Sequence, residues 1–163
     1  MILGVATTWD KRKGFDDYLK LASLLPPSYL ILTYEMQAQL PANMIGMGKT
    51  KSQDELAALY AMADVVTSLS VSESMGMTPV EGFACGTPAI VYDNTAQPEL
   101  VTPERGLVVK TGDVESVRGA VLEICEKGEY HYSKPCRERA EEFFSKDYNF
   151  QRYIEQYNDI LAR

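Results

Sequence analysis

The chain has 163 residues, which is enough for one well-buried domain and short for two. Apolar residues make up 45% and charged residues 24%, as in ordinary globular domains, and no apolar run approaches the roughly 18 residues that span a bilayer. The net charge of −7 argues against nucleic acid or an anionic lipid surface as a partner. We therefore expect any bound phosphate to be held locally, by loops and a few lysines.

The chain opens on an apolar run, 1–6, that is typical of a buried strand and not of a signal peptide. Because the first residues already form a strand pattern, we expect a further domain upstream. The cysteines form an odd set without C-x-x-C spacing: Cys85, Cys125 and Cys136. Neither a disulfide framework nor a zinc site is indicated, and a reducing cytosol fits this set.

Short apolar or β-branched runs recur along the chain, each of the kind found in buried parallel strands. The expected strands are 2–6, 29–34, 44–47, 65–69, 89–92 and 107–109. Helical patterns fill the gaps, with apolar residues at i, i+3, i+4 and i+7 in 15–25 and in 56–63, the latter after a capping box of Ser52 and Glu55. A third stripe follows Asp113, the expected N-cap, and contains Val117, Val121, Ile124 and Cys125.

From about Tyr130 the strand patterns stop and helical patterns continue to the end of the chain. Apolar residues of this tail have helical spacing at Phe150, Tyr153, Ile154, Tyr157 and Leu161. We expect the tail to dock on the sheet or on the missing domain. Alternating strands and helices predict an α/β fold: a Rossmann-like, doubly wound parallel sheet with a C-terminal helical tail. Ligands of such sheets bind outside the carboxyl ends of the strands.

Glu73 and Glu81 stand eight positions apart, on a loop and a short helix that follow the expected strand 65–69. A glycine-containing loop after a strand leaves free backbone N–H groups at the next helix N-terminus, where the helix dipole favours phosphate. Two carboxylates beside such a site are free to bind the hydroxyls of a sugar or ribose. The structural alternative is a capping box from Thr78 to Glu81 with Gly86 as the helix stop, which would explain Glu81 but not Glu73.

Two further loops are expected at the same edge of the sheet. Lys11–Gly14 follows the first strand; alone it is typical of a solvated turn, but beside a diphosphate its lysine can neutralise the charge that develops during transfer. The loop 97–100 follows the fifth expected strand, and Glu99 within it is interpreted as an acid at the start of a helix.

Three other patterns do not indicate a function. Gly46–Thr50 is similar to the end of a phosphate-binding P-loop, but the glycine required at its start is replaced by Asn43. No G-x-G-x-x-G follows the first strand, so an NAD-type fingerprint is absent. His131 stands alone in a polar stretch and is predicted to be a surface residue and not a base.

Six motifs resemble, in order, the C-terminal domain of GT-B fold retaining glycosyltransferases of the family 4, or glycosyl transferases group 1, type. They are Trp9–Gly14 (WDKRKG), Asp54–Asp64 (DELAALYAMAD), Glu73–Glu81 (ESMGMTPVE), Ala84–Pro88 (ACGTP), Pro98–Leu100 (PEL) and Gly106–Asp113 (GLVVKTGD). The resemblance covers residues 1–145. It implies a Rossmann-like donor-binding domain at 1–145, a C-terminal helix at 146–163, and an N-terminal acceptor domain that is absent from this chain.

The resemblance also implies a role for each matching residue. The two catalytic roles fall to Glu73, which reaches the hydroxyls of the donor sugar, and to Lys13, which contacts the diphosphate. Glu81 binds the ribose of the nucleotide. Backbone groups of the intervening loop hold the sugar and the diphosphate: Ser74, Met75, Gly76, Met77 and Thr78.

The chain departs from the family pattern at Thr8, where members usually carry an arginine that clamps the phosphates. Arg12 is the neighbouring residue that could take that role. The resemblance therefore supports donor binding more firmly than full activity.

The implied reaction transfers a sugar from a nucleoside diphosphate sugar to a saccharide or lipid-linked acceptor, with retention at the anomeric carbon, in polysaccharide biosynthesis. No metal and no cofactor is expected, because Lys13 and the helix-end amides stand where a cation would neutralise the diphosphate. Two alternatives stay open: half of a sugar-nucleotide epimerase, or a non-catalytic nucleotide-sugar-binding module. The expected location is the cytoplasm, or the inner face of the membrane for a full-length enzyme.

Overall fold

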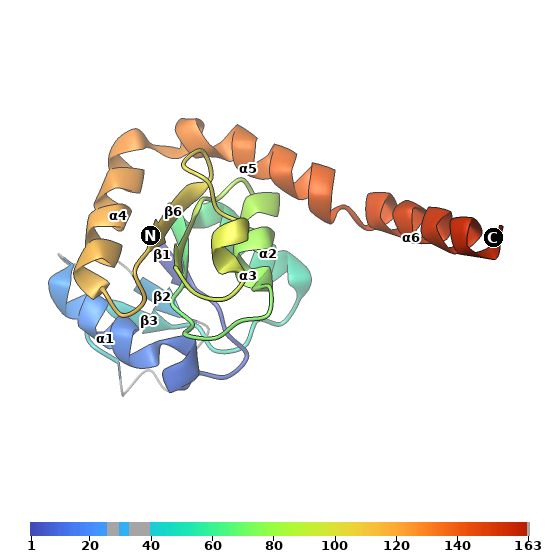
Figure 1. The fold of residues 1–163 in the computed structure, drawn as a ribbon. Helices are drawn as coiled ribbons and strands as arrows, with labels where there is room; N and C mark the ends of the chain where they lie inside the picture. Colours follow the sequence, from blue (N-terminus) through green and yellow to red (C-terminus); the bar gives the residue numbers. More distant parts are fainter. Residues whose placement is uncertain (26–29, 33–39, 163) are drawn as a thin grey trace.

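The computed structural model describes residues 1–25, 30–32 and 40–162, and its centre is a sheet of six parallel strands (Figure 1). The strands are β1 (Ile2–Gly4), β2 (Leu30–Leu32), β3 (Met44–Gly46), β4 (Val65–Ser68), β5 (Ala89–Tyr92) and β6 (Gly106–Val109). Their order is β3-β2-β1-β4-β5-β6, so the direction of winding reverses between β1 and β4. The predicted doubly wound parallel sheet is confirmed; positions 29, 33 and 34 of the second expected strand lie outside the described residues.

Helices cover both faces of the sheet. The α-helices are α1 (Phe15–Leu24), α2 (Gln53–Met62), α3 (Met77–Ala84), α4 (Val114–Lys127), α5 (Glu129–Phe144) and α6 (Lys146–Leu161), and the short 3-10 helices are η1 (Lys11–Lys13) and η3 (Gln97–Glu99). Helix α1 packs beside α4 on one face, whereas α3 packs between α2 and α5 on the other (Figure 1). None of the helices in the described parts of the chain is both long and apolar enough to cross a membrane.

Two of the predicted helix starts form as expected. The Ser52 hydroxyl accepts a hydrogen bond from the backbone N–H of Glu55 at 3.1 Å, while the Glu55 carboxylate accepts from the N–H of Lys51 at 2.6 Å. The Asp113 carboxylate accepts from the N–H of Ser116 at 3.0 Å. These side chains satisfy N–H groups that have no partner within the first turn of a helix.

The strands divide their side chains between two apolar layers, as the two-residue period of a strand requires. Ile2 packs in the larger cluster, which contains Tyr18 and Leu21 of α1. Its neighbour Leu3 packs in the smaller cluster with Leu59 and Tyr60 of α2. The central strands are therefore buried on both faces, and their carboxyl ends are held in fixed positions relative to each other.

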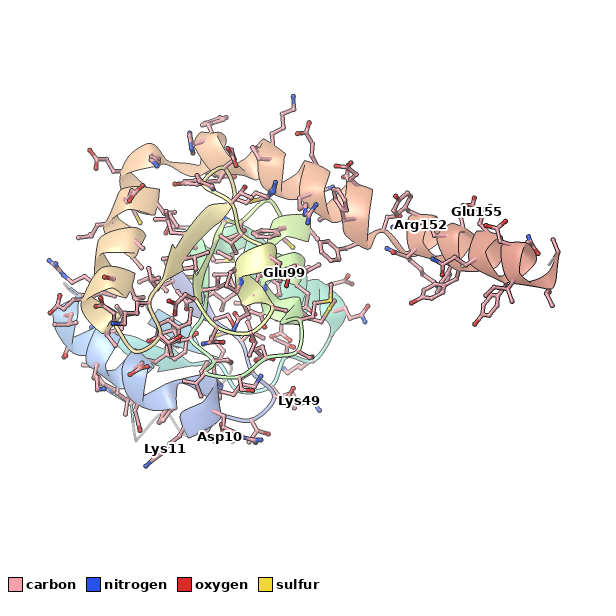
Figure 2. All side chains as sticks on the ribbon, in the orientation of Figure 1. Asp10, Lys11, Lys49, Glu99, Arg152 and Glu155 are labelled. Carbon is pink, nitrogen blue, oxygen red and sulfur yellow. The ribbon has the colours of Figure 1, made fainter. Side chains whose placement is uncertain are left out.

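The C-terminal tail is helical, and its two helices differ: α5 packs against α3 with Tyr132, Cys136 and Ala140 buried, whereas α6 does not dock on the rest of the domain. Helix α6 has no buried residue and projects from the end of α5 (Figure 1), with Arg152 and Glu155 on the projecting part (Figure 2). Docking on the sheet, one of the two expected alternatives, is therefore not found for α6, and docking on a further domain stays a prediction. Helical spacing predicts the helix and does not say what its apolar side meets. The helical stripe after Asp113 also includes Cys125, but this residue is exposed, because the buried positions of α4 end at Ile124.

Candidate functional site

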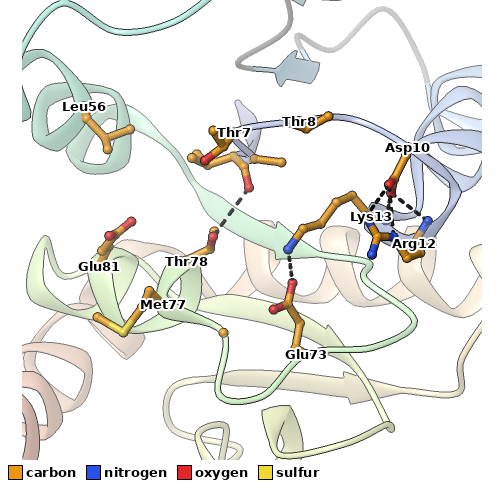
Figure 3. Close-up of a pocket in the computed structure, with 13 residues that line it drawn as sticks. Thr7, Thr8, Asp10, Arg12, Lys13, Leu56, Glu73, Met77, Thr78 and Glu81 are labelled. Carbon is orange, nitrogen blue, oxygen red and sulfur yellow. Dashed lines mark hydrogen bonds and ion pairs between the residues drawn. The ribbon is translucent and has the colours of Figure 1, made fainter.

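A pocket of about 450 Å³ lies at the carboxyl ends of β1 and β4 (Figure 3). Its walls come from the segment after β1, including η1, from the loop after β4 with the start of α3, and from Leu56 of α2. Because β1 and β4 are the neighbours at which the sheet reverses direction, this is the crevice where ligands of doubly wound sheets bind.

The first loop is folded by its own side chains. Asp10 is the N-cap of η1, and its carboxylate accepts from the backbone N–H groups of Arg12 and Lys13 at 2.9 and 3.1 Å. The same carboxylate accepts from the Arg12 guanidinium at 2.9 and 3.1 Å, and these bonds hold the pKa of Asp10 below its usual range. Trp9 packs edge-on against Tyr18 of α1, with 5.0 Å between the ring centroids.

Gly14 brings this loop into contact with the end of β4. Its φ is +73°, a conformation that residues with a Cβ rarely adopt, and a Cβ at this position would lie 2.1 Å from the carbonyl oxygen of Leu69. Nearby, the backbone N–H of Val71 donates to the carbonyl of Arg12 at 2.8 Å. The loop therefore lies directly on the chain that leaves β4, which sets Lys13 beside the Glu73 loop.

Lys13 and Glu73 form an ion pair inside the pocket (Figure 3). The Glu73 side chain is 17% exposed and that of Lys13 is 37% exposed, so the pair is partly shielded from water and still within reach of a ligand. The backbone N–H of Glu73 donates to the hydroxyl of Thr95 at 3.2 Å. Thr95 has a φ of 50°, the only positive φ of a non-glycine residue in the described ranges. The loop after β5 thus supports the loop that carries Glu73.

Helix α3 does not begin as the capping pattern predicts. Its N-cap is Gly76, at φ 78°, without a side-chain cap, and the helix begins at Met77. The Thr78 hydroxyl donates instead to the carbonyl of Val5 in a long bond of 3.5 Å. The capping box of Thr78 and Glu81 is therefore wrong, because the N-cap is the left-handed Gly76 and the helix begins two residues earlier than that box requires. The first N–H groups of α3 have no partner within the helix, and the residues at its start, Gly76, Met77 and Thr78, line the pocket. The predicted stop at Gly86 is confirmed, with φ +84° just after the helix.

The Glu81 carboxylate is held by a hydrogen bond from a buried tyrosine. The hydroxyl of Tyr60 donates to Glu81 Oε2 at 2.6 Å, whereas the ring of Tyr60 is 1% exposed. Burial and the nearby carboxylate raise the pKa of Tyr60, so the phenol keeps its proton and remains the donor. Glu81 itself is partly exposed and lines the pocket.

The structure brings most of the predicted site residues together in this pocket. Those that line it are Thr8, Arg12, Lys13, Glu73, Gly76, Met77, Thr78 and Glu81. Ser74 and Met75 are exposed and are not part of the lining. Figure 3 shows Glu73 beside Lys13 and Glu81 at the opposite end, with Met77 and Thr78 between them.

Other lining residues were not predicted as part of the site. Val5, Ala6 and Thr7 directly follow β1 and line the pocket, and their position follows from the sheet edge alone. Asp10 could have been found as an N-cap before the run of basic residues. Leu56 belongs to an apolar stripe, and its spacing gives no sign that it borders a pocket.

The excluded patterns stay outside the pocket. His131 is exposed on α5, as predicted, and Lys49 is not part of the lining. Within the described ranges, no three His, Cys, Asp or Glu side chains gather closely enough to hold a metal ion.

Known proteins resemble this chain in sequence. The family model described as glycosyl transferases group 1 matches residues 4–143. N-acetyl-alpha-D-glucosaminyl L-malate synthase of Bacillus anthracis is 28% identical over 136 residues, which cover 83% of this chain and 34% of that protein. A GDP-mannose-dependent alpha-(1-6)-phosphatidylinositol dimannoside mannosyltransferase of Mycobacterium tuberculosis is 33% identical over 104 residues, covering 64% of this chain and 26% of that protein.

Solved structures agree on the fold. HepE of Anabaena, determined in complex with UDP-glucose, superposes with a TM-score of 0.80 at 19% identity and covers 97% of this chain and 48% of its own. The chain thus spans about a third or less of the two curated relatives and about half of this structure. With the family model matching most of its length, the chain belongs to the glycosyl transferases group 1 family, and its fold is that of one half of a GT-B glycosyltransferase.

Proposed function

We propose that this chain is the donor-binding half of a retaining glycosyltransferase, which transfers a sugar from a nucleoside diphosphate sugar to a saccharide or lipid-linked acceptor. The observation that carries the proposal is the pocket itself. One cavity combines a lysine, the N-terminus of α3 and two glutamates at its opposite ends. A nucleoside diphosphate sugar has the matching order of groups: ribose hydroxyls, two phosphates and sugar hydroxyls.

The role of each residue is the one that the family resemblance implies, and the charges along the pocket are compatible with it. Lys13 and the free N–H groups of α3 attract the diphosphate, and neutralise the charge that grows on it as the glycosidic bond breaks. Glu81, the fifth residue of α3, accepts hydrogen bonds from the ribose hydroxyls. Glu73 accepts from the hydroxyls of the donor sugar. The retaining stereochemistry rests on the family resemblance of the Glu73–Glu81 motif.

The Lys13–Glu73 ion pair suggests how the donor enters. Without ligand, the two side chains neutralise each other. A diphosphate offers Lys13 a partner of higher negative charge, and we expect it to compete with Glu73 for the ammonium group. Glu73 is then released to accept from sugar hydroxyls. The lysine and the carboxylate would thus change partners together.

The names of the relatives support the class of donor and not its identity. One relative is described as GDP-mannose-dependent, and one similar structure contains UDP-glucose. We therefore propose a nucleoside diphosphate sugar without choosing the base. Residues 1–145 would form the donor-binding domain. The helix at 146–163 would dock on an N-terminal acceptor domain, and the full-length enzyme would work in the cytoplasm or at the inner face of the membrane in polysaccharide biosynthesis.

Titration of the purified chain with UDP, GDP, ADP, CDP and dTDP tests the proposal. We expect selective but weak binding of at least one nucleoside diphosphate and no transferase activity, because the 163 residues tested correspond to only about half of HepE. The Lys13→Ala variant should lose most of that affinity, whereas Lys49→Ala, which changes a lysine outside the pocket, should retain it. If no nucleoside diphosphate produces heat or a melting shift at millimolar concentration, the proposal is wrong.

A non-catalytic nucleotide-sugar-binding module is the second candidate, because the basic clamp is incomplete. Thr8 lines the pocket where the family usually has arginine, and the guanidinium of Arg12 is bound to Asp10. Thr8→Arg should tighten binding of a nucleoside diphosphate relative to the monophosphate if position 8 matches the family arginine. If Thr8→Arg changes nothing and Arg12→Ala abolishes the preference for the diphosphate, Arg12 is the clamp.

A further inference from the structure

We infer that Tyr60 is a positioning residue for nucleotide recognition, which fixes the Glu81 carboxylate in the orientation that accepts the ribose hydroxyls. The inference rests on the proposed function, since it assigns Glu81 to the ribose. Tyr60 does not line the pocket, so it acts through lining residues that it contacts: its hydroxyl bonds to Glu81 and also lies beside the Thr78 hydroxyl.

Tyr60 is itself held firmly. It stands in the last turn of α2 and is 1% exposed in the smaller apolar cluster, among Leu59, Ala63 and Val66. Its backbone carbonyl accepts from the Thr87 hydroxyl at 2.7 Å. The phenol ring is therefore fixed by packing, and the backbone that carries it is held by Thr87 in the chain that follows α3.

The contact between Tyr60 and Glu81 has the geometry of a strong hydrogen bond. The 2.6 Å separation between the phenol oxygen and Oε2 is typical of an O–H group that donates to an ionised carboxylate. A glutamate on a helix normally samples several rotamers, and burying or ordering it costs entropy. A bond to one carboxylate oxygen removes that freedom before the ligand arrives, and it leaves Oε1 free to accept.

The two glutamates of the pocket differ in this respect. The partner of Glu73 is Lys13, which the proposed function assigns to the diphosphate, so that contact changes when the donor binds. The phenol of Tyr60 is buried beneath α3 and outside the pocket lining, so it does not compete with a ligand for Glu81. Tyr60 therefore preorganises the ribose end of the pocket in both the free and the bound state.

The Tyr60→Phe variant tests this inference, because it keeps the ring and removes only the donor. Its dissociation constants for UDP and GDP are measured by nuclear magnetic resonance titration, together with that for inorganic pyrophosphate. We expect nucleoside diphosphate binding to weaken about fivefold to tenfold, as for the loss of one hydrogen bond to a charged group. Pyrophosphate has no ribose, and its affinity should be unchanged.

Tyr92→Phe is the matched control. Tyr92 is also fully buried, and its hydroxyl donates to a carboxylate, Asp17 Oδ2, at 2.8 Å, but neither residue lines the pocket. This variant should lose a comparable buried hydrogen bond and keep the affinity for the nucleotide. Urea unfolding of both variants separates effects on stability from effects on binding.

A double-mutant cycle completes the test. In a Glu81→Ala background, Tyr60→Phe should have no further effect on nucleotide affinity, because the carboxylate that Tyr60 is inferred to position is removed. Unchanged nucleotide binding by Tyr60→Phe, an equal loss of pyrophosphate binding, or an effect that persists without Glu81 would each overturn the inference alone. A wild-type chain that binds no nucleoside diphosphate would overturn the proposed function and this inference with it.

Discussion

One end of the pocket is built from loops, whereas the other end is built on the core. Lys13 and Glu73 are carried by two loops that rest on each other, and their side chains are joined by an ion pair that a ligand can reach. Glu81 stands on a helix and is bonded to a tyrosine that is buried under it. The difference separates an end that can change partners from an end that is fixed.

This division suits the chemistry proposed for the two ends. Charge develops at the phosphates and at the sugar during transfer, so the groups that meet it must exchange partners between free enzyme, donor complex and product. The ribose does not react, and a rigid acceptor is sufficient for it. The same pocket can therefore combine adaptable catalytic side chains with a fixed site for the nucleotide.

The largest expected effect comes from Gly14→Ala, which disturbs the packing of the loop that carries Lys13 against the chain after β4. The new methyl group would lie 2.1 Å from the carbonyl oxygen of Leu69, in a left-handed conformation that already disfavours alanine. We expect the free energy of unfolding to fall by about 3 kcal/mol or more, since both backbone strain and steric overlap contribute. Urea unfolding measures this loss, and nucleotide titration should show binding weakened along with it.

Gly119→Ala is the control for that variant. Gly119 lies within α4, and a Cβ there would meet nothing within 4 Å. Alanine at an open helical position should raise the free energy of unfolding by about 0.5–1 kcal/mol. A Gly14→Ala protein as stable as the wild type would contradict the role of Gly14 in seating the first loop on β4.

The loop end of the pocket could be predicted from the sequence, because it follows from local pattern and topology. Strand ends that belong to adjacent parallel strands must meet at one edge, so the loops of Lys13 and Glu73 were expected together. The supporting contacts were not predictable in the same way. Thr95 touches the Glu73 loop through one hydroxyl, and a single threonine in a polar loop carries no signal of that contact.

The core end shows where local pattern misleads. The spacing of Thr78 and Glu81 fits a capping box, yet the partner of Glu81 is Tyr60, 21 positions away. Tyr60 belongs to an apolar stripe of α2, and periodicity describes such a residue only as core. A tyrosine hydroxyl that must find a partner when buried is the one chemical clue, and its partner depends on tertiary packing.

Replacing each carboxylate by an amide should distinguish the two ends of the pocket. The effects of the two variants on the free energy of nucleoside diphosphate binding should differ by about 1–2 kcal/mol. Glu81→Gln removes a charged acceptor for the ribose and should weaken nucleoside diphosphate binding about 5- to 30-fold. Glu73→Gln removes an acceptor for a sugar that free nucleotides lack, and it also removes a partly exposed ion pair that competes only weakly for Lys13, so nucleotide binding should not weaken and should tighten by less than about twofold. Calorimetric titration with UDP and GDP compares them, and equal effects of the two variants would contradict the division of roles.

The smallest expected effect concerns Gln97, which is fully buried and packs against Gly76, a residue that lines the pocket. A Cβ added to Gly76 would lie 3.5–3.8 Å from the Gln97 side chain, and neither amide atom of Gln97 has a hydrogen-bond partner among the described residues. Burying an unpaired amide is costly, whereas an apolar side chain of similar shape has no such penalty. Gln97→Leu should therefore raise the free energy of unfolding by about 1 kcal/mol, while Gln53→Leu, at an exposed position, should change it by less than about 0.5 kcal/mol. A clear loss of stability in Gln97→Leu would mean that the amide is satisfied in solution, and that its polarity helps to hold the Gly76 loop in place.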